Sequence, residues 1–73
     1  MKFSIAINRG NILDVINLAE ENNLIINSIS QEPINDEMMN IKIDFSANSK
    51  VIDIDNFVKI ISGYDFLSSC ERI

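Results

Sequence analysis

The sequence predicts an α+β fold built from two strand–helix–strand units in the order β-α-β-β-α-β. Apolar residues alternate with polar or small ones in residues 3–8, 39–45 and 66–73, which is the period of a strand with one buried face. Residues 12–19 and 54–61 carry apolar residues at i, i+3, i+4 and i+7, so each can form a helix with one apolar stripe. An isoleucine-rich segment after the first helix supplies the remaining strand.

The first helix has a start signal and a stop signal. Its apolar stripe consists of Ile12, Val15, Ile16 and Ala19. Asn11 is expected to cap the helix, and Asp14, three residues on, places a carboxylate near the positive end of the helix dipole. Asn22 and Asn23 are expected to end it, because asparagine tolerates the left-handed conformation found at helix C-termini.

A hairpin joins the two strand–helix–strand units. Residues 24–31 are predicted as the second strand, and Pro33 with residues 35–37 supplies turn chemistry before the strand at 39–45. Gly63 follows the second helical stripe and stops it. Right-handed crossovers and a central hairpin favour a four-stranded antiparallel sheet with both helices on one face, the ferredoxin-like arrangement. Since 73 residues leave no room for a second core, residues 1–73 are predicted to form a single domain.

One face of such a sheet has no helix over it. Strict alternation places Ile25 and Ile29 on the side of the second strand opposite Leu24, Ser28 and Ser30, so both sides of this strand carry apolar surface. A small core gains stability by burying more surface. We therefore expect Ile25 and Ile29 to form an association surface for a second copy or a host protein. The alternative is that they sit singly in water, which is common.

The composition argues against several function classes. Six basic against eleven acidic residues give a net charge of -5 without a basic run, which disfavours nucleic acids and anionic membranes. No histidine is present and Cys70 is the only cysteine, so the usual zinc and general-base constellations are missing. We expect no enzymatic activity, no metal and no cofactor.

Hydropathy gives an expected location. The longest apolar run, residues 24–26, is far shorter than the roughly 20 residues that span a bilayer. The N-terminus lacks the apolar region and cleavage site of a secretory signal. We therefore expect no membrane insertion by this segment and a cytoplasmic location.

Two short motifs admit a functional and a structural interpretation. Arg9-Gly10-Asn11 has a single glycine and matches neither the dinucleotide-binding nor the P-loop pattern. Two interpretations remain: a turn that starts the helix, or the edge of a small-molecule pocket. The segment at 53–56 has the acidic spacing of a calcium loop but lacks its glycine and its final glutamate. Acidic residues at a helix start also serve the helix dipole.

Three segments together resemble the ACT domain family of small regulatory modules. Where the family commonly has Arg-Pro-Gly-Val-Leu, this chain has Arg9-Gly10-Asn11-Ile12-Leu13. Residues 23–31 are similar to the family's Gly-Ile-Asn-Ile segment and the polar strand after it, and residues 64–73 to its usual ending. Two positions depart from the pattern, because Asn11 replaces a usual glycine and Ile25 replaces a frequent asparagine.

The resemblance implies a module that pairs into a larger sheet and binds a small molecule, often an amino acid, near the first turn. Carried over by position, the residues that would border this site are Asn8, Arg9, Gly10, Asn11 and Ile12. We expect a non-enzymatic regulatory domain that couples a small-molecule effector at this corner to dimerisation or host-protein packing. The alternative is a structural interaction module without a ligand, such as the C-terminal part of a larger bacterial enzyme or membrane protein.

Overall fold

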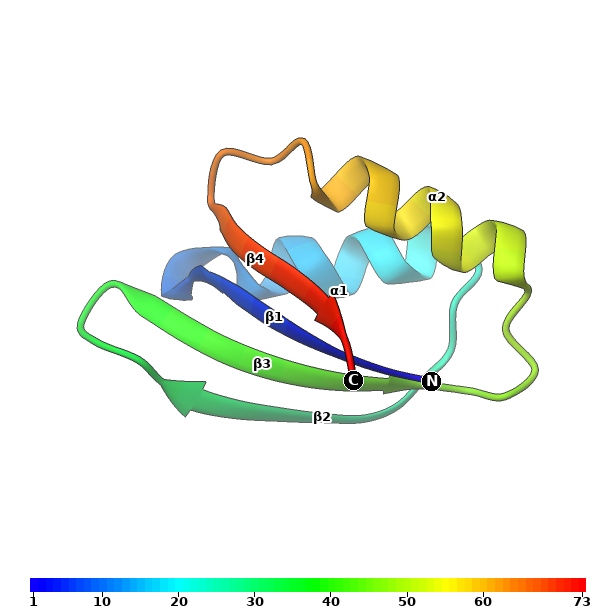
Figure 1. The fold of residues 1–73 in the computed structure, drawn as a ribbon, viewed down its shortest axis with the longest axis horizontal. Coiled ribbons are helices and arrows are strands. Elements are labelled where there is room, and N and C mark those ends of the chain that lie inside the picture. The colour runs from blue at the N-terminus through cyan, green and yellow to red at the C-terminus, as the bar shows by residue number, and fades with distance from the viewer.

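A twisted four-stranded sheet with two helices packed on one face forms the molecule in the computed structural model, which describes residues 1–73 (Figure 1). In chain order the elements are β1 (Lys2–Asn8), the 3₁₀ turn η1 (Arg9–Asn11), α1 (Ile12–Glu21), β2 (Ile26–Pro33), β3 (Met38–Phe45), α2 (Val51–Ile61) and β4 (Leu67–Arg72). Every predicted strand and helix is present, and their order is the predicted one.

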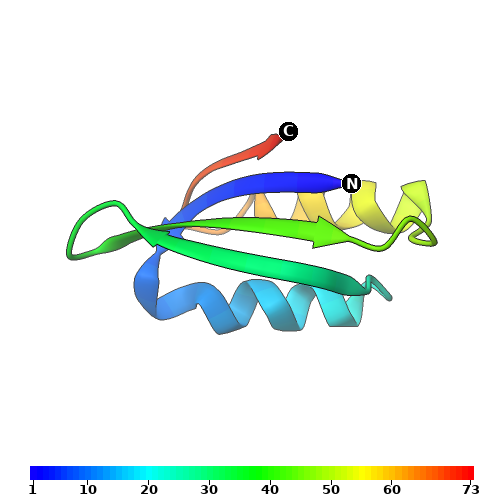
Figure 2. The same ribbon diagram turned by 90° about the horizontal axis from the view of Figure 1, so that it is seen from below.

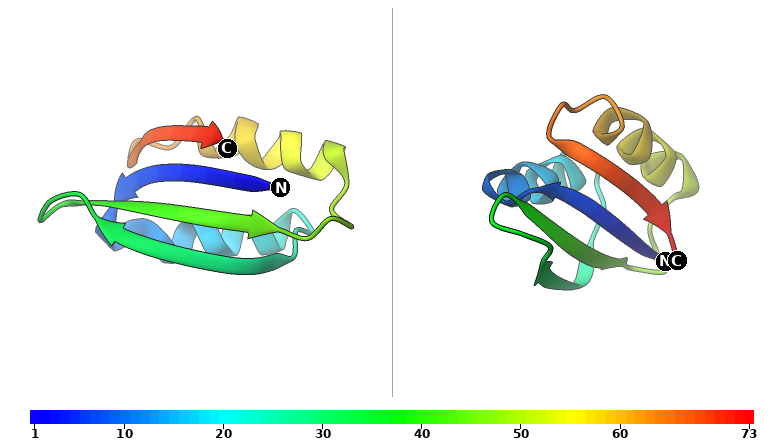
Figure 3. Two further views of the ribbon diagram at one scale, coloured as in Figure 1. Left: turned by 60° about the horizontal axis from the view of Figure 1, so that its bottom comes forward. Right: turned by 60° about the vertical axis from the view of Figure 1, so that its left-hand side comes forward.

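The sheet has the strand order β2-β3-β1-β4, and each neighbouring pair is antiparallel. Both helices lie behind the same face of the sheet in the left view of Figure 3. This topology confirms the ferredoxin-like arrangement. The β2–β3 hairpin extends past the corner that joins β1 to α1 (Figure 2), which brings its turn close to that corner.

Fourteen buried residues make up the core, and all of them are apolar. They are Phe3, Ile5, Ile7, Val15, Leu18, Ala19, Leu24, Met39, Ile41, Ile43, Phe45, Ile54, Phe57 and Ile61. Three of the phenylalanines form a row of edge-to-face contacts, with ring centroids 5.9 Å apart for Phe3 and Phe45 and 5.4 Å apart for Phe45 and Phe57. Such contacts add to the stabilisation from burial alone.

Strand β2 departs from strict alternation. Ile26 lies opposite Phe45 and Ser28 lies opposite the next residue of β3, Asp44, so the intervening residue is an extra one at a β-bulge. After the bulge, Ile29 lies opposite the fully buried Ile43, on the helix-covered face, and packs partly against the core.

The bulge corrects the expected placement of Ile25 and Ile29 on one common side. Ile25 precedes β2 and its side chain is 62% exposed, whereas Ile29 is partly buried. Leu24, expected on the side opposite Ile29, also belongs to the core. The two isoleucines therefore do not form one continuous surface patch.

The face of the sheet without helices is mostly polar. Ser28 and Asp44 lie side by side on it, and so do Ser30, Lys42 and Ser4 in the next row. The Ser4 hydroxyl donates a hydrogen bond to Asn40 Oδ1 at 3.1 Å. A polar face of this kind is stable in water without a partner.

Asparagines end α1 as predicted. Asn23 has a φ of 62°, the left-handed conformation expected at this point. The Asn22 side-chain amide donates to the Leu18 carbonyl oxygen at 2.8 Å, in addition to the backbone hydrogen bond that this oxygen accepts from the Asn22 N–H.

Candidate ligand-binding site

The corner at residues 8–12 is held by hydrogen bonds within the chain. Asn8 Oδ1 accepts from the Gly10 backbone N–H at 3.0 Å. The Arg9 backbone N–H donates to the Glu37 carbonyl oxygen at 2.8 Å, and Arg9 Nη1 donates to the Asp36 carbonyl oxygen at 3.4 Å. The corner is thereby attached to the tip of the β2–β3 hairpin. The side chains of Asn8 and Arg9 remain exposed.

Asn11 does not cap the helix, contrary to expectation. The 3₁₀ turn starts the helical segment earlier, so Asn8 takes the capping position. Asn11 Nδ2 instead donates to Asp14 Oδ2 at 2.7 Å. Gly10 has no positive φ, and a Cβ there would lie 3.4 Å from its nearest neighbour, Asn8 Oδ1, which is an ordinary contact. Neither backbone conformation nor crowding requires a glycine at this position.

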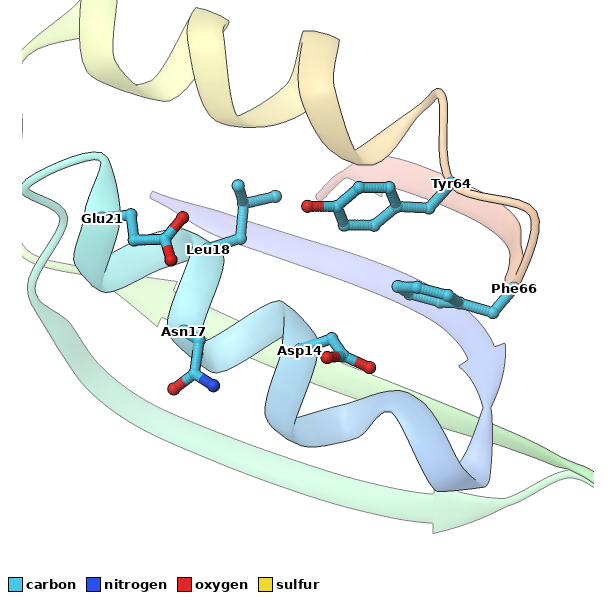
Figure 4. A pocket seen from close by; sticks show the side chains of 6 residues that line it. All are labelled: Asp14, Asn17, Leu18, Glu21, Tyr64 and Phe66. Carbon is cyan, nitrogen blue, oxygen red and sulfur yellow. The ribbon is translucent and has the colours of Figure 1, made fainter.

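A cleft of about 360 Å³ lies next to the corner, between α1 and the loop that leads into β4 (Figure 4). One wall is a flank of α1 formed by Asp14, Asn17, Leu18 and Glu21, and the other is formed by Tyr64 and Phe66. The two aromatic rings are tilted against each other, with centroids 4.8 Å apart. A volume of this size falls within the usual range for small-molecule pockets. None of the corner residues lines it.

The corner positions both walls of this cleft. The Asn8 backbone N–H donates to the Phe66 carbonyl oxygen at 3.0 Å, which fixes the start of the aromatic wall. The bond from Asn11 to Asp14 orients a carboxylate on the helical wall. The residues expected to border a ligand thus contact two lining residues of the cleft, one from each wall.

Sequence reasoning missed the cleft itself. From the sequence, Asp14 has a predicted role only at the helix dipole, Asn17 and Glu21 are not singled out, and Phe66 is placed in the last strand. The available signal is a polar stripe at i, i+3 and i+7 beside the apolar one, together with two aromatic residues two positions apart. Only the folded chain brings these two features together.

The lining of the cleft is acidic and aromatic. It holds two carboxylates, an amide, a phenol and no basic side chain. Cys70 lies outside it; burial raises the pKa of this thiol, which favours its protonated form at neutral pH. No group of three or more His, Cys, Asp or Glu side chains is placed to hold a metal ion. None of the helices is long and apolar enough to cross a membrane.

The fold and the cleft define a small ferredoxin-like α+β domain with a ligand-sized hollow on its helical side. No protein-family model matches the sequence, and no curated protein matches it either. Among solved structures, the chain is similar to the C-terminal domain of the MgtC protein from Mycobacterium tuberculosis, with a TM-score of 0.73. The match covers 96% of this chain and 80% of that one at 9% sequence identity, so what the two share is the fold.

Proposed function

We propose that this chain is a non-enzymatic, ACT-like regulatory domain that binds a small molecule, such as an amino acid, in the cleft between α1 and residues 64–66. The observation that carries the proposal is the pair of hydrogen bonds by which Asn8 and Asn11 hold Phe66 and Asp14. These bonds connect the corner that the ACT resemblance implicates to a hollow of suitable size.

The same geometry offers a route from binding to association. Phe66 directly precedes β4, which forms one edge of the sheet. An edge strand presents unpaired backbone groups that a second chain can join. A ligand held by Phe66 would bias the position of β4 and hence the association of this edge with a second copy or a host protein. Coupling of this kind is typically worth about 1–3 kcal/mol.

A structural interaction module without a ligand is the second candidate. Its support is that the polar groups of Asn8 and Arg9 are already engaged within the chain. The similar solved structure is the C-terminal domain of its own protein, which supports a setting in which this chain is one part of a longer protein. In that setting Ile25, which is 62% exposed, would contact the host.

Sedimentation equilibrium with and without a mixture of free amino acids separates the two candidates. For a regulatory domain, the ligand changes the association constant by about 5-fold to 150-fold, the range of typical coupling energies. Arg9→Ala removes the hydrogen bond from the Arg9 side chain to the Asp36 carbonyl oxygen, keeps the backbone bond to Glu37, and is expected to reduce this change. For a structural module, the mixture has no effect, and Arg9→Ala associates as the wild type does.

Ile25→Glu tests the association surface of the second candidate, because Ile25 lies beside β2, at the edge of the sheet opposite β4. Placing a charge at an interface should weaken association, whereas Leu13→Glu, at a position 66% exposed on α1, serves as the matched control. Association that is unchanged by Ile25→Glu at every concentration would remove Ile25 from the interface.

A further inference from the structure

The charge distribution of the molecule singles out the cleft between α1 and residues 64–66. The chain has six basic residues, and four of them line its two other hollows: Lys2, Lys42, Lys59 and Arg72. The cleft has none, and contains the carboxylates of Asp14 and Glu21. Neither carboxylate belongs to an ion pair, since the one ion pair of the molecule joins the N-terminus to Asp44. The cleft therefore favours ligands with a net positive charge over neutral or negatively charged ones.

The opposite wall adds an independent preference for cations. Tyr64 and Phe66 are both partly buried, and the ring of Tyr64 extends toward α1 with its hydroxyl group on the Leu18 side (Figure 4). The face of an aromatic ring attracts an ammonium or guanidinium group. Leu18 and the rings also offer apolar contact to a methylene chain, which a hydrated metal ion does not use.

We propose that the cleft takes organic cations, in which an ammonium or guanidinium group is carried on a short methylene chain. This inference rests on the proposed function and names the ligand class for the same cleft. Asp14 and Glu21 are seven residues apart on one helix flank, which places their Cα atoms about 10 Å apart along the axis. A flexible ligand with two cationic groups can reach both carboxylates while its methylene chain lies against the aromatic wall.

The test compares L-lysine with L-norleucine, which has the same chain length without the terminal ammonium group. Titrations of the full chain, followed by amide NMR, should show L-lysine binding at least about 3-fold more tightly, with shifts at the cleft. Glu21→Gln should weaken L-lysine binding by about 2-fold to 5-fold, the range for an exposed ion pair. Glu20→Gln removes the same charge from the adjacent exposed position outside the cleft and should leave binding unchanged.

A second variant tests the aromatic wall. Tyr64→Leu keeps an apolar side chain but removes the ring face, so L-lysine should bind about 2-fold to 5-fold more weakly while the amide spectrum retains its dispersion. Raising the salt concentration should also weaken L-lysine binding, because the carboxylates are exposed.

The outcomes separate this inference from the proposed function. Equal affinity for L-lysine and L-norleucine, or equal effects of Glu21→Gln and Glu20→Gln, would overturn the preference for cations and leave a small-molecule domain standing. Shifts confined to another surface would overturn the site. If no amino acid of any charge binds, both this inference and the proposed function fail.

Discussion

Because of the bulge in β2, we expect Ile25 and Ile29 to contribute very differently to the stability of the fold. Replacing a fully buried isoleucine by alanine costs about 2–5 kcal/mol. Ile29 lies opposite the buried Ile43 but is itself only partly buried, so Ile29→Ala should lower the free energy of unfolding by about 1–2 kcal/mol. Ile25 is 62% exposed, and Ile25→Ala should change it by less than about 0.5 kcal/mol.

Urea unfolding followed by circular dichroism measures both changes. With a slope of about 1 kcal/mol per molar urea, typical of a small domain, the midpoint should fall by about 1–2 M for Ile29→Ala and by less than about 0.5 M for Ile25→Ala. Each curve is recorded at several protein concentrations, so that a change in association is recognised by its concentration dependence. Equal losses for the two variants, or a larger loss for Ile25→Ala, would refute the register described for β2.

Three further predictions concern the core, the end of α1 and the single thiol. Phe57→Ala should lower the free energy of unfolding by about 3–5 kcal/mol. Ile52→Ala, at a position 66% exposed on the same helix, should change this free energy little, and thermal unfolding compares the two variants. Asn23→Ala should cost about 1 kcal/mol because of the φ of 62°, whereas Asn23→Gly should not, and chemical denaturation distinguishes them. Burial raises the pKa of the Cys70 thiol above its ordinary value of 9.0, so the folded chain holds this proton more tightly than the unfolded chain does. The resulting stability is present below about pH 9 and is lost as the pH rises through the folded-state pKa; urea curves across this window should show a decline that Cys70→Ala lacks.

The architecture was predictable from the sequence because its apolar periods are regular. Ile5, Ile7, Ile41 and Ile43 fall where alternation places a buried face, and Ile54, Phe57 and Ile61 fall on one helical stripe. The second strand was less predictable, because three consecutive apolar residues at 24–26 fit either parity of alternation. The extra residue at the bulge shifts the alternation by one position, so that Leu24 and Ile29 both face the core.

The candidate site was only half predictable. The corner at residues 8–12 was located from sequence, but two asparagines there are equally suited to capping, and the 3₁₀ turn assigns that position to Asn8. The cleft depends on Glu21 and Tyr64 meeting across the helical layer, although they are far apart in the chain. No local sequence pattern shows that these residues come close in space. Their closeness follows from how α1 and the loop after α2 pack on the sheet.

The cleft beside the corner is proposed to bind a small molecule and to transmit this binding to association. The most direct test is a pair of amide NMR spectra of the full chain, without and with a mixture of free amino acids, recorded together with sedimentation equilibrium. We predict shifts confined to residues 8–12, the cleft flank of α1 and residues 64–66, together with a changed association constant. Spectra that do not move, from a chain whose association is also unchanged, would contradict the claim.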